Sequence, residues 1–217
     1  MPSYPKKFSY QNKATAESYF DKRFSSPEGR RKNEATRAAL VRALEWIPAT
    51  GKILDIPCGT GRFTQFFYER GYLYFGADIS MEMLDVLVGE QKAPGKMVPV
   101  VRCDGEQLPF KDNVFDCVVC IRFLNLIPGT VRENILREMR RVSREWLIVQ
   151  SHHLKSIGPF ILLKVFIRKL IGGDVSKYQL HGEILSTGWR EMTKVRIRHT
   201  RHCVGIYQKT KDIRTVQ

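Results

Sequence analysis

The stretch Ile53-Leu54-Asp55-Ile56-Pro57-Cys58-Gly59-Thr60-Gly61-Arg62-Phe63 decides the fold of this 217-residue chain. Apolar residues interleaved with one acid run into a Gly-x-Gly turn, and a helical pattern follows from Phe63 to Arg70. This order predicts a strand, a tight loop that exposes its backbone, and the N-terminus of a helix. Such an arrangement lets a nucleotide-like ligand approach the main chain.

The composition is that of a soluble globular protein, with 43% hydrophobic and 27% charged residues. The length fits one domain, or a domain with an appendage. Against 22 Asp and Glu residues stand 36 Lys and Arg residues, and the resulting net charge of +14 favours anionic partners. Nucleic acid, an acidic lipid surface and a phosphorylated substrate all fit that charge. The N-terminal residues 1–7 lack the apolar core of a signal peptide, so we expect a cytoplasmic protein.

We expect no metal site. Cys117 and Cys120 have the spacing of a zinc half-site, but they lie in an apolar run that predicts a strand. Residues three apart in a strand point to opposite faces, so the two sulfurs should diverge. No second CxxC pair is present in the sequence to complete a zinc site.

Strands and helices are expected to alternate along the chain. A short helix is expected over 14–24, and a longer one is expected from the Ser26 cap and Pro27 towards Ile47. Thr130 and Glu133 form a capping-box pattern for a helix that runs to about 142. Further helices are expected at 63–70, after Ser80 and at 183–188, and strands at 53–56, 72–77, 97–103, 114–121, 146–149, 194–198 and 203–208. This order predicts a parallel sheet with right-handed crossovers that closes with an antiparallel hairpin.

Three of the predicted strands end in acids, at Asp55, Asp78 and Asp104. Ligands of an open parallel sheet bind at the carboxyl ends of its strands, so these acids should meet around one site. Asp78 stands where a carboxylate can accept both hydroxyls of a ribose. Asp104 lies within reach of a purine amino group, and Asp55 can hold a positively charged amino group, directly or through water.

The glycine loop disfavours a nicotinamide nucleotide. That cofactor is associated with Gly-x-Gly-x-x-Gly, whose third glycine permits close packing of helix and strand over a pyrophosphate. Thr64 occupies the third position here. A ligand without a pyrophosphate, but with an amino-acid cation for Asp55, fits the loop better, and S-adenosylmethionine meets both requirements.

Four motifs between residues 35 and 150 resemble those of class I S-adenosylmethionine-dependent methyltransferases, and most closely the small-molecule branch with the quinone-biosynthesis C-methyltransferases (methyltransferase type 11). They are ILDIPCGTG at 53–61, GADIS at 76–80, DGEQLPF at 104–110 and FDCVVC at 115–120. The resemblance implies an α/β, Rossmann-like, seven-stranded, mostly parallel sheet with helices on both faces and a C-terminal antiparallel hairpin. Residues 1–34 are expected to form an N-terminal flap and helix start, and residues 35–217 the methyltransferase domain.

The resemblance also implies a site for S-adenosylmethionine, whose product is S-adenosylhomocysteine. The glycine loop would abut the methionyl part, and Asp55 would help to hold its amino group. Asp78 would bind the ribose, Ile79 and Met83 would flank the adenine, and residues 104–105 would reach the adenine amino nitrogen. The expected cofactor contacts are Asp55, Cys58, Gly59, Thr60, Gly61, Asp78, Ile79, Met83, Asp104, Gly105 and Ile121.

Fewer sequence features indicate the acceptor site than indicate the cofactor site. Members of this branch often carry a histidine shortly after the fourth strand, but Asn125 and Leu126 occupy that region here. His152, which follows the fifth strand, is the candidate general base, a role that is needed only if the nucleophile must lose a proton. The candidate acceptor contacts are Tyr10, Tyr19, Arg122, Asn125, His153 and His181.

A basic amphipathic insertion is expected at about 154–182, where the apolar run 157–171 carries Lys164, Arg168 and Lys169. It is too short and too charged to span a membrane. It is either a lid over a hydrophobic acceptor, a helix lying on an anionic membrane surface, or an ordinary helix covering the sheet. We therefore expect a small, hydrophobic or lipid-like acceptor. RNA methylation and a non-catalytic, cofactor-binding partner subunit are the alternatives; RNA is disfavoured because the sequence has no RNA-binding appendage.

Overall fold

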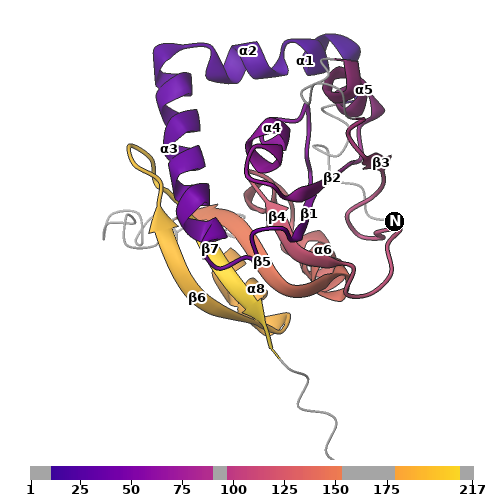
Figure 1. Cartoon of the computed structure of the whole chain (residues 1–217), viewed down its shortest axis with the longest axis vertical. Helices are drawn as coiled ribbons and strands as arrows, with labels where there is room; N and C mark the ends of the chain where they lie inside the picture. Colours follow the sequence, from indigo (N-terminus) through magenta and orange to yellow (C-terminus); the bar gives the residue numbers. More distant parts are fainter. Residues whose placement is uncertain (1–10, 90–96, 153–178, 211–217) are drawn as a thin grey trace, which may run out of the picture.

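The computed structural model describes residues 11–89, 97–152 and 179–210, which are built around one seven-stranded sheet (Figure 1). The strand order is β3-β2-β1-β4-β5-β7-β6. Strands β1 to β5 pair in parallel, whereas β7 lies between β5 and β6 and is antiparallel to both. The strands are β1 Lys52–Asp55, β2 Leu73–Asp78, β3 Val100–Arg102, β4 Phe115–Cys120, β5 Ser143–His152, β6 Trp189–Arg196 and β7 His202–Lys209. The predicted fold class is confirmed.

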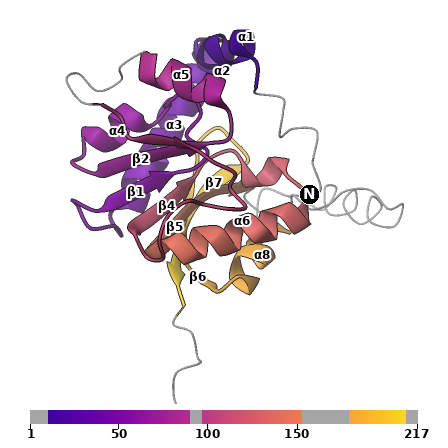
Figure 2. The same ribbon diagram turned by 90° about the vertical axis from the view of Figure 1, so that its right-hand side faces the viewer.

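Helices cover both faces of the sheet (Figure 2). They are α1 Lys13–Glu17, α2 Tyr19–Phe24, α3 Pro27–Leu44, α4 Thr64–Tyr68, α5 Met81–Gly89, α6 Gly129–Val142 and α8 Leu180–Ser186, with a short 3-10 helix, η2, at Leu124–Leu126. Buried side chains of α3, α4 and α5 pack on one face, and those of α6 and α8 pack on the other. Figure 1 shows α1 and α2 running across the top of the molecule, from α5 to α3.

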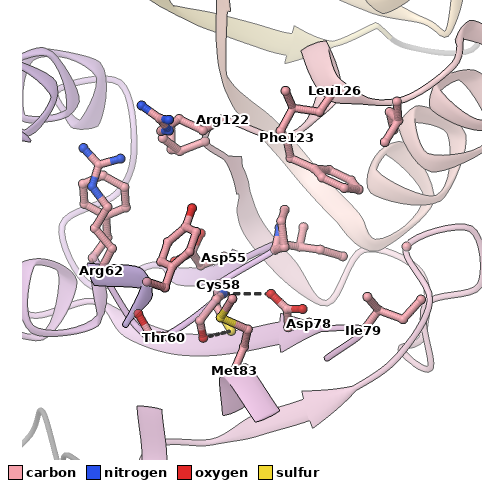
Figure 3. A pocket seen from close by; sticks show the side chains of 18 of the residues that line it. Asp55, Cys58, Thr60, Arg62, Asp78, Ile79, Met83, Arg122, Phe123 and Leu126 are labelled. Carbon is pink, nitrogen blue, oxygen red and sulfur yellow. Dashed lines mark hydrogen bonds between the residues drawn. The ribbon is translucent and has the colours of Figure 1, made fainter. Parts of the chain in front are cut away.

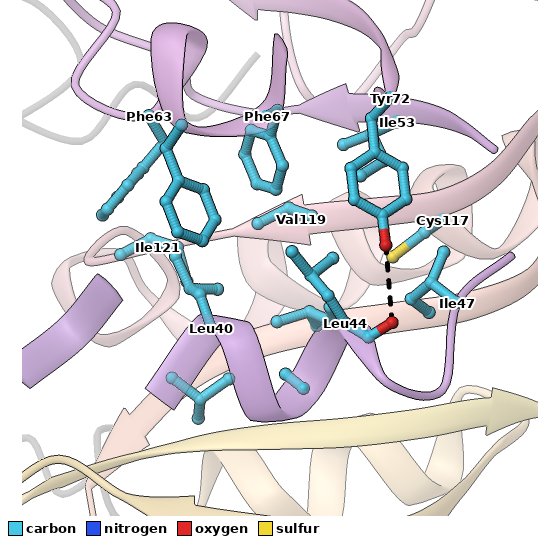
Figure 4. Close-up of a cluster of buried hydrophobic side chains, with 14 of the residues drawn as sticks. Leu40, Leu44, Ile47, Ile53, Phe63, Phe67, Tyr72, Cys117, Val119 and Ile121 are labelled. Atoms are coloured by element: carbon cyan, nitrogen blue, oxygen red, sulfur yellow. Dashed lines mark hydrogen bonds between the residues drawn. The ribbon is translucent and has the colours of Figure 1, made fainter. Parts of the chain in front are cut away.

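The alternation of side chains along β4 explains how one strand serves both faces. Cys117 and Val119 belong to the apolar cluster under α3, whereas Cys120 belongs to the cluster under α6. The prediction that the two cysteines diverge is therefore confirmed. Figure 4 shows the first cluster, in which the Tyr72 hydroxyl donates a hydrogen bond to the backbone oxygen of Leu44 at 3.4 Å.

The starts of two helices differ in how well the sequence predicted them. Ser26 caps α3 as expected, because its Oγ accepts a hydrogen bond from the Gly29 N–H at 3.0 Å. At α6 the capping-box prediction is wrong. The helix begins at Gly129, directly after Pro128, so Thr130 lies inside the first turn and makes no cap. Glu133 instead accepts a hydrogen bond from Arg137, one turn further along.

The C-terminal elements begin earlier than predicted because contacts distant in sequence extend them. Helix α8 starts at Leu180 and β6 at Trp189, and both residues are buried against the α6 face. A buried ion pair fixes α8 in place. The guanidinium of Arg132, fully buried on α6, donates to both carboxylate oxygens of Glu183 and to the backbone oxygen of Leu124.

Some predictions fall on residues that the structure does not describe. Tyr10, His153 and the charged residues Lys164, Arg168 and Lys169 lie outside the described ranges, as does the insertion up to residue 178. In the described part of the chain, no helix has the length and apolarity needed to cross a bilayer. Within the same residues, no group of His, Cys, Asp and Glu side chains could hold a metal ion.

Candidate functional site

A cavity opens at the carboxyl ends of β1, β2 and β4 (Figure 3). Its walls come from the loop between β1 and α4, the ends of β2 and β4, the turn after β3, and α2. Every predicted cofactor residue except Gly61 lines it: Asp55, Cys58, Gly59, Thr60, Asp78, Ile79, Met83, Asp104, Gly105 and Ile121. Separate sequence motifs therefore converge on one cavity, as the strand-end argument expects.

The two glycines of the loop have left-handed backbones but serve different purposes. Gly59 has φ +55°, and an added Cβ there would meet nothing within 4 Å, so a ligand can approach its backbone. Gly61 has φ +75°, and an added Cβ would lie 2.8 Å from Cγ of Leu87 on α5. Gly61 is not among the residues that line the cavity. Its small size instead allows α5 to pack against the loop.

Asp78 holds the glycine loop in shape. Its Oδ2 accepts a hydrogen bond from the Gly59 N–H at 2.8 Å, and its Oδ1 accepts one from the Ser80 N–H at 3.0 Å. Burial raises the pKa of this carboxyl, and the backbone hydrogen bonds oppose that rise. A carboxylate has about four lone-pair positions, so Asp78 can still accept hydrogen bonds from a ligand. Sequence reasoning did not identify this positioning role.

Asp55 is a buried acid beside Asp78, with only 2% of its surface exposed. Burial raises its pKa to about 8, and the charge of Asp78 adds to that rise. The hydroxyl of Tyr74 donates a hydrogen bond to Asp55 Oδ2 at 3.3 Å, which counteracts the rise. Because an opposite charge favours the ionised form, the two acids form a site that a cationic group would stabilise.

Asp104 lines the cavity from a turn rather than from a strand end. Strand β3 ends at Arg102, one residue before the predicted end at Cys103, and Asp104 pairs with Gln107 in an isolated bridge. Its Oδ1 accepts a hydrogen bond from the Glu106 N–H at 3.1 Å. This side-chain hydrogen bond within a turn is typical of aspartate, and it explains why the strand stops early.

Three arginines that line the cavity come from distant parts of the chain. Arg23 lies on α2, Arg62 follows the glycine loop, and Arg122 follows β4. Only Arg122 was predicted as a site residue. Arg62 comes directly after the motif at 53–61, so its position next to the loop was available from the sequence. Arg23 reaches the cavity only because α2 crosses above it, which no local pattern reveals.

Arg62 is held firmly in its wall. Its Nε donates a hydrogen bond to Asn33 Oδ1 at 2.8 Å, and its guanidinium stacks over the rings of Phe24 and Phe63, with centroids 4.1 and 4.5 Å away. Its pKa is lowered to about 9, mainly by burial and in second place by the nearby charge of Arg122. The cation is therefore confined between aromatic rings in a setting that opposes its charge.

The candidate acceptor residues divide into two groups. Tyr19 and Arg122 line the cavity. His152 lies against His202 on β7, with ring centroids 4.6 Å apart, and Asn125 donates a hydrogen bond to a backbone oxygen of β5. His181 on α8 lies 3.2 Å from the Glu191 carboxylate of β6. These last three do not line the cavity, because their strand and helix partners hold them elsewhere.

Comparisons with known proteins agree with this geometry. Residues 53–145 match a family model described as a methyltransferase domain. The ubiquinone/menaquinone biosynthesis C-methyltransferase of Burkholderia mallei is 40% identical over 98 residues, which cover 43% of this chain and 39% of that protein. The chain therefore matches about two fifths of the length of such relatives.

Solved structures share the fold at low sequence identity. A protein from Pyrococcus horikoshii OT3 superimposes with a TM-score of 0.70 at 17% identity, over 96% of this chain and 100% of that one. Magnesium protoporphyrin IX methyltransferase from Synechocystis PCC 6803, solved with bound S-adenosylmethionine, gives 0.66 at 14% identity. That match covers 97% of this chain and 100% of the Synechocystis chain.

Proposed function

We propose that this chain, whose residues 53–145 match a methyltransferase domain, is a class I S-adenosylmethionine-dependent methyltransferase that acts on a small-molecule acceptor. One observation supports this most strongly. Asp55 and Asp78 lie buried at the ends of neighbouring strands, around a glycine whose backbone is open to the cavity. In a ligand with a cationic amino group and a ribose, the amino group would pair with Asp55 and the ribose hydroxyls would donate hydrogen bonds to Asp78.

Each part of S-adenosylmethionine can be assigned to residues that line the cavity. Its amino group would pair with Asp55, and its methionyl part would run along the backbone at Gly59. The ribose hydroxyls would donate to Asp78. Ile79 and the buried Met83 would enclose the adenine, because both line the cavity next to Asp78 and offer apolar surface. The turn at residues 104–105 would face the adenine edge.

Methyl transfer requires no covalent bond between the protein and either reactant. An electron pair of the acceptor attacks the methyl carbon, the carbon–sulfur bond breaks, and its electron pair stays on sulfur, which becomes a neutral thioether. Any proton on the nucleophile leaves to water or to a base. The protein must align the two molecules and exclude water. Ile121, Phe123 and Leu126 supply the apolar surface for that task on the β4 side of the cavity.

The acceptor is proposed to be small and hydrophobic in its body. The apolar residues on the β4 side support this, and so do the names of two similar proteins, which refer to quinone biosynthesis and to a porphyrin. A cytoplasmic location, at the membrane surface when the acceptor is lipid-like, is part of the same proposal.

Calorimetric titration of the folded chain with S-adenosylmethionine and S-adenosylhomocysteine tests the proposal. We expect saturable binding at one site per chain. Asp78→Asn should weaken it at least about tenfold, because the loss of a hydrogen bond to a charged group costs about 1.5–3 kcal/mol. Asp85→Asn, on the exposed surface of α5, is the matched control and should bind normally. Unchanged affinity of Asp78→Asn would contradict the ribose assignment, and no binding by the folded wild type would contradict the function.

A further inference from the structure

Two of the cavity arginines lie together, away from the adenine side of the site. Figure 3 shows Arg62 and Arg122 on one side of the cavity and Ile79 on the opposite side. Both guanidinium groups lie near the Phe24 ring of α2, at 4.1 and 5.9 Å from its centroid. Two cations around one ring repel each other, so their convergence costs free energy that a further partner should offset.

Arg62 has an unused donor in this position. Although its Nε bonds to Asn33, its Nη1 is buried and makes no hydrogen bond within the described residues. A buried donor without a partner costs about 1–3 kcal/mol and calls for an explanation. The same guanidinium is mostly enclosed, so it cannot turn freely into water to satisfy that donor.

Arg122 is held in an unusual backbone conformation. Its φ is +63°, a left-handed value that a residue with a long side chain adopts at a cost of about 1–3 kcal/mol. The strained residue lies two positions after the end of β4, and it lines the cavity. Such backbone strain persists only where the surrounding structure maintains it, and strained residues cluster at functional sites.

No carboxylate in the described part of the chain completes this pair. Within residues 11–89, 97–152 and 179–210, neither Arg62 nor Arg122 forms an ion pair. Asp55 is the one carboxylate among the described groups that influence the pKa of Arg62, and its effect is smaller than those of burial, Arg122, Tyr19 and Arg37. Asp55 is also the acid that the cationic part of the cofactor would use.

We propose that the methyl acceptor carries an anionic group, a carboxylate or a phosphate, which binds between Arg62 and Arg122. This inference rests on the proposed function and names the class of its acceptor as an apolar organic acid. Arg23 lies at the same cavity and adds a third positive charge. The body of the acceptor would pack on Phe123 and Leu126, across from the arginines.

Small aromatic probes test the proposal in the full chain saturated with S-adenosylhomocysteine. Benzoate and phenyl phosphate carry the two anionic groups, and benzamide and benzyl alcohol are neutral counterparts of similar size. We expect an anion to bind at least about tenfold more tightly than a neutral probe, because charge-assisted hydrogen bonds are worth about 1.5–3 kcal/mol. The tighter of the two anions identifies the group.

The variants Arg62→Gln and Arg122→Gln should each reduce this preference, and together they should abolish it. Arg190→Gln removes a charge from the exposed surface of β6 and should leave the preference intact. Because Arg62 packs between two rings, Arg62→Gln can lose its fold, and circular dichroism monitors this. Arg122 has an exposed side chain, so Arg122→Gln should keep its fold. If Arg62→Gln is unfolded, Arg122→Gln alone tests whether the arginines bind the anionic group.

Any of three results would overturn the proposal. The first is that the neutral probes bind as tightly as the anions, and the second is that the preference for anions survives in the folded Arg122→Gln variant. The third is that this variant loses affinity for S-adenosylhomocysteine. The last result would assign the arginines to the cofactor. Failure of the proposed function is distinguishable, because the wild-type chain would then not bind S-adenosylhomocysteine before any probe is added.

Discussion

The stability of Asp55→Asn relative to the wild type should increase as the pH rises, although the replacement removes a residue of the candidate site. Burial raises the pKa of Asp55 to about 8, so its carboxyl keeps a proton in the folded chain at pH values where the unfolded chain has lost it. For an acid with a raised folded pKa, stability is greatest at low pH and is lost as the pH rises. The asparagine side chain has nearly the same shape and no such titration.

The size of the effect follows from that difference in proton binding. Between the unfolded pKa of about 4 and the folded value, the folded state holds about one extra proton. Stability of the wild type then falls by about 1.4 kcal/mol per pH unit from this group. Between pH 5 and pH 7, the stability of Asp55→Asn relative to wild type should rise by about 3 kcal/mol. The group is 2% exposed, so solvent screening does little to reduce this value.

Urea unfolding of both proteins at pH 5, 6 and 7 measures this change. Asp85→Asn, an exposed replacement on α5, is the control, and its difference from wild type should not vary with pH. S-adenosylhomocysteine should raise the melting temperature of the wild type, whereas Asp55→Asn should lose most of that rise. A stability difference that stays constant from pH 5 to pH 7 would refute the reasoning, since Asp55 would then be ionised in the free protein.

Three other predictions concern the loop, the buried ion pair and the cofactor. Gly61→Ala should cost about 2 kcal/mol in urea unfolding, because φ is +75° and the new Cβ would press on Leu87; a stability equal to wild type would contradict this. Glu183→Gln should cost about 3 kcal/mol, because it removes the carboxylate charge that pairs with the buried guanidinium of Arg132; full stability by the same method would show that α8 does not depend on this pair. Binding of S-adenosylhomocysteine at pH 7 should release up to one proton as Asp55 ionises, measured by calorimetry in buffers of different ionisation enthalpy, and no release would contradict the pairing.

The sequence predicted the central strands well because their physical signal is local. β4 is buried on both faces and therefore shows as a nearly continuous apolar run from Val114 to Ile121, interrupted by Asp116. The C-terminal elements were placed too late because their burial depends on α6. Neither Leu180 nor Trp189 stands in a pattern that reveals its contact with that helix.

The side of the cavity that is proposed to hold the cofactor was predictable for a similar reason. Its residues stand in short continuous motifs at strand ends, and the sheet brings those ends together. The arginine side was not predictable. Arg62 depends on Asn33, 29 residues earlier in the chain, and Phe24 meets both Arg62 and Arg122 only because α2 crosses the top of the sheet.

A crystal structure of the chain with S-adenosylhomocysteine tests the central claim most directly. We expect the ligand to fill the cavity, with its ribose hydroxyls within hydrogen-bond distance of Asp78 and its amino group beside Asp55. Its adenine should lie between Ile79 and Met83, and Arg62 and Arg122 should remain free for an acceptor. A ligand bound elsewhere, or one whose carboxylate is held by those two arginines, would contradict the account.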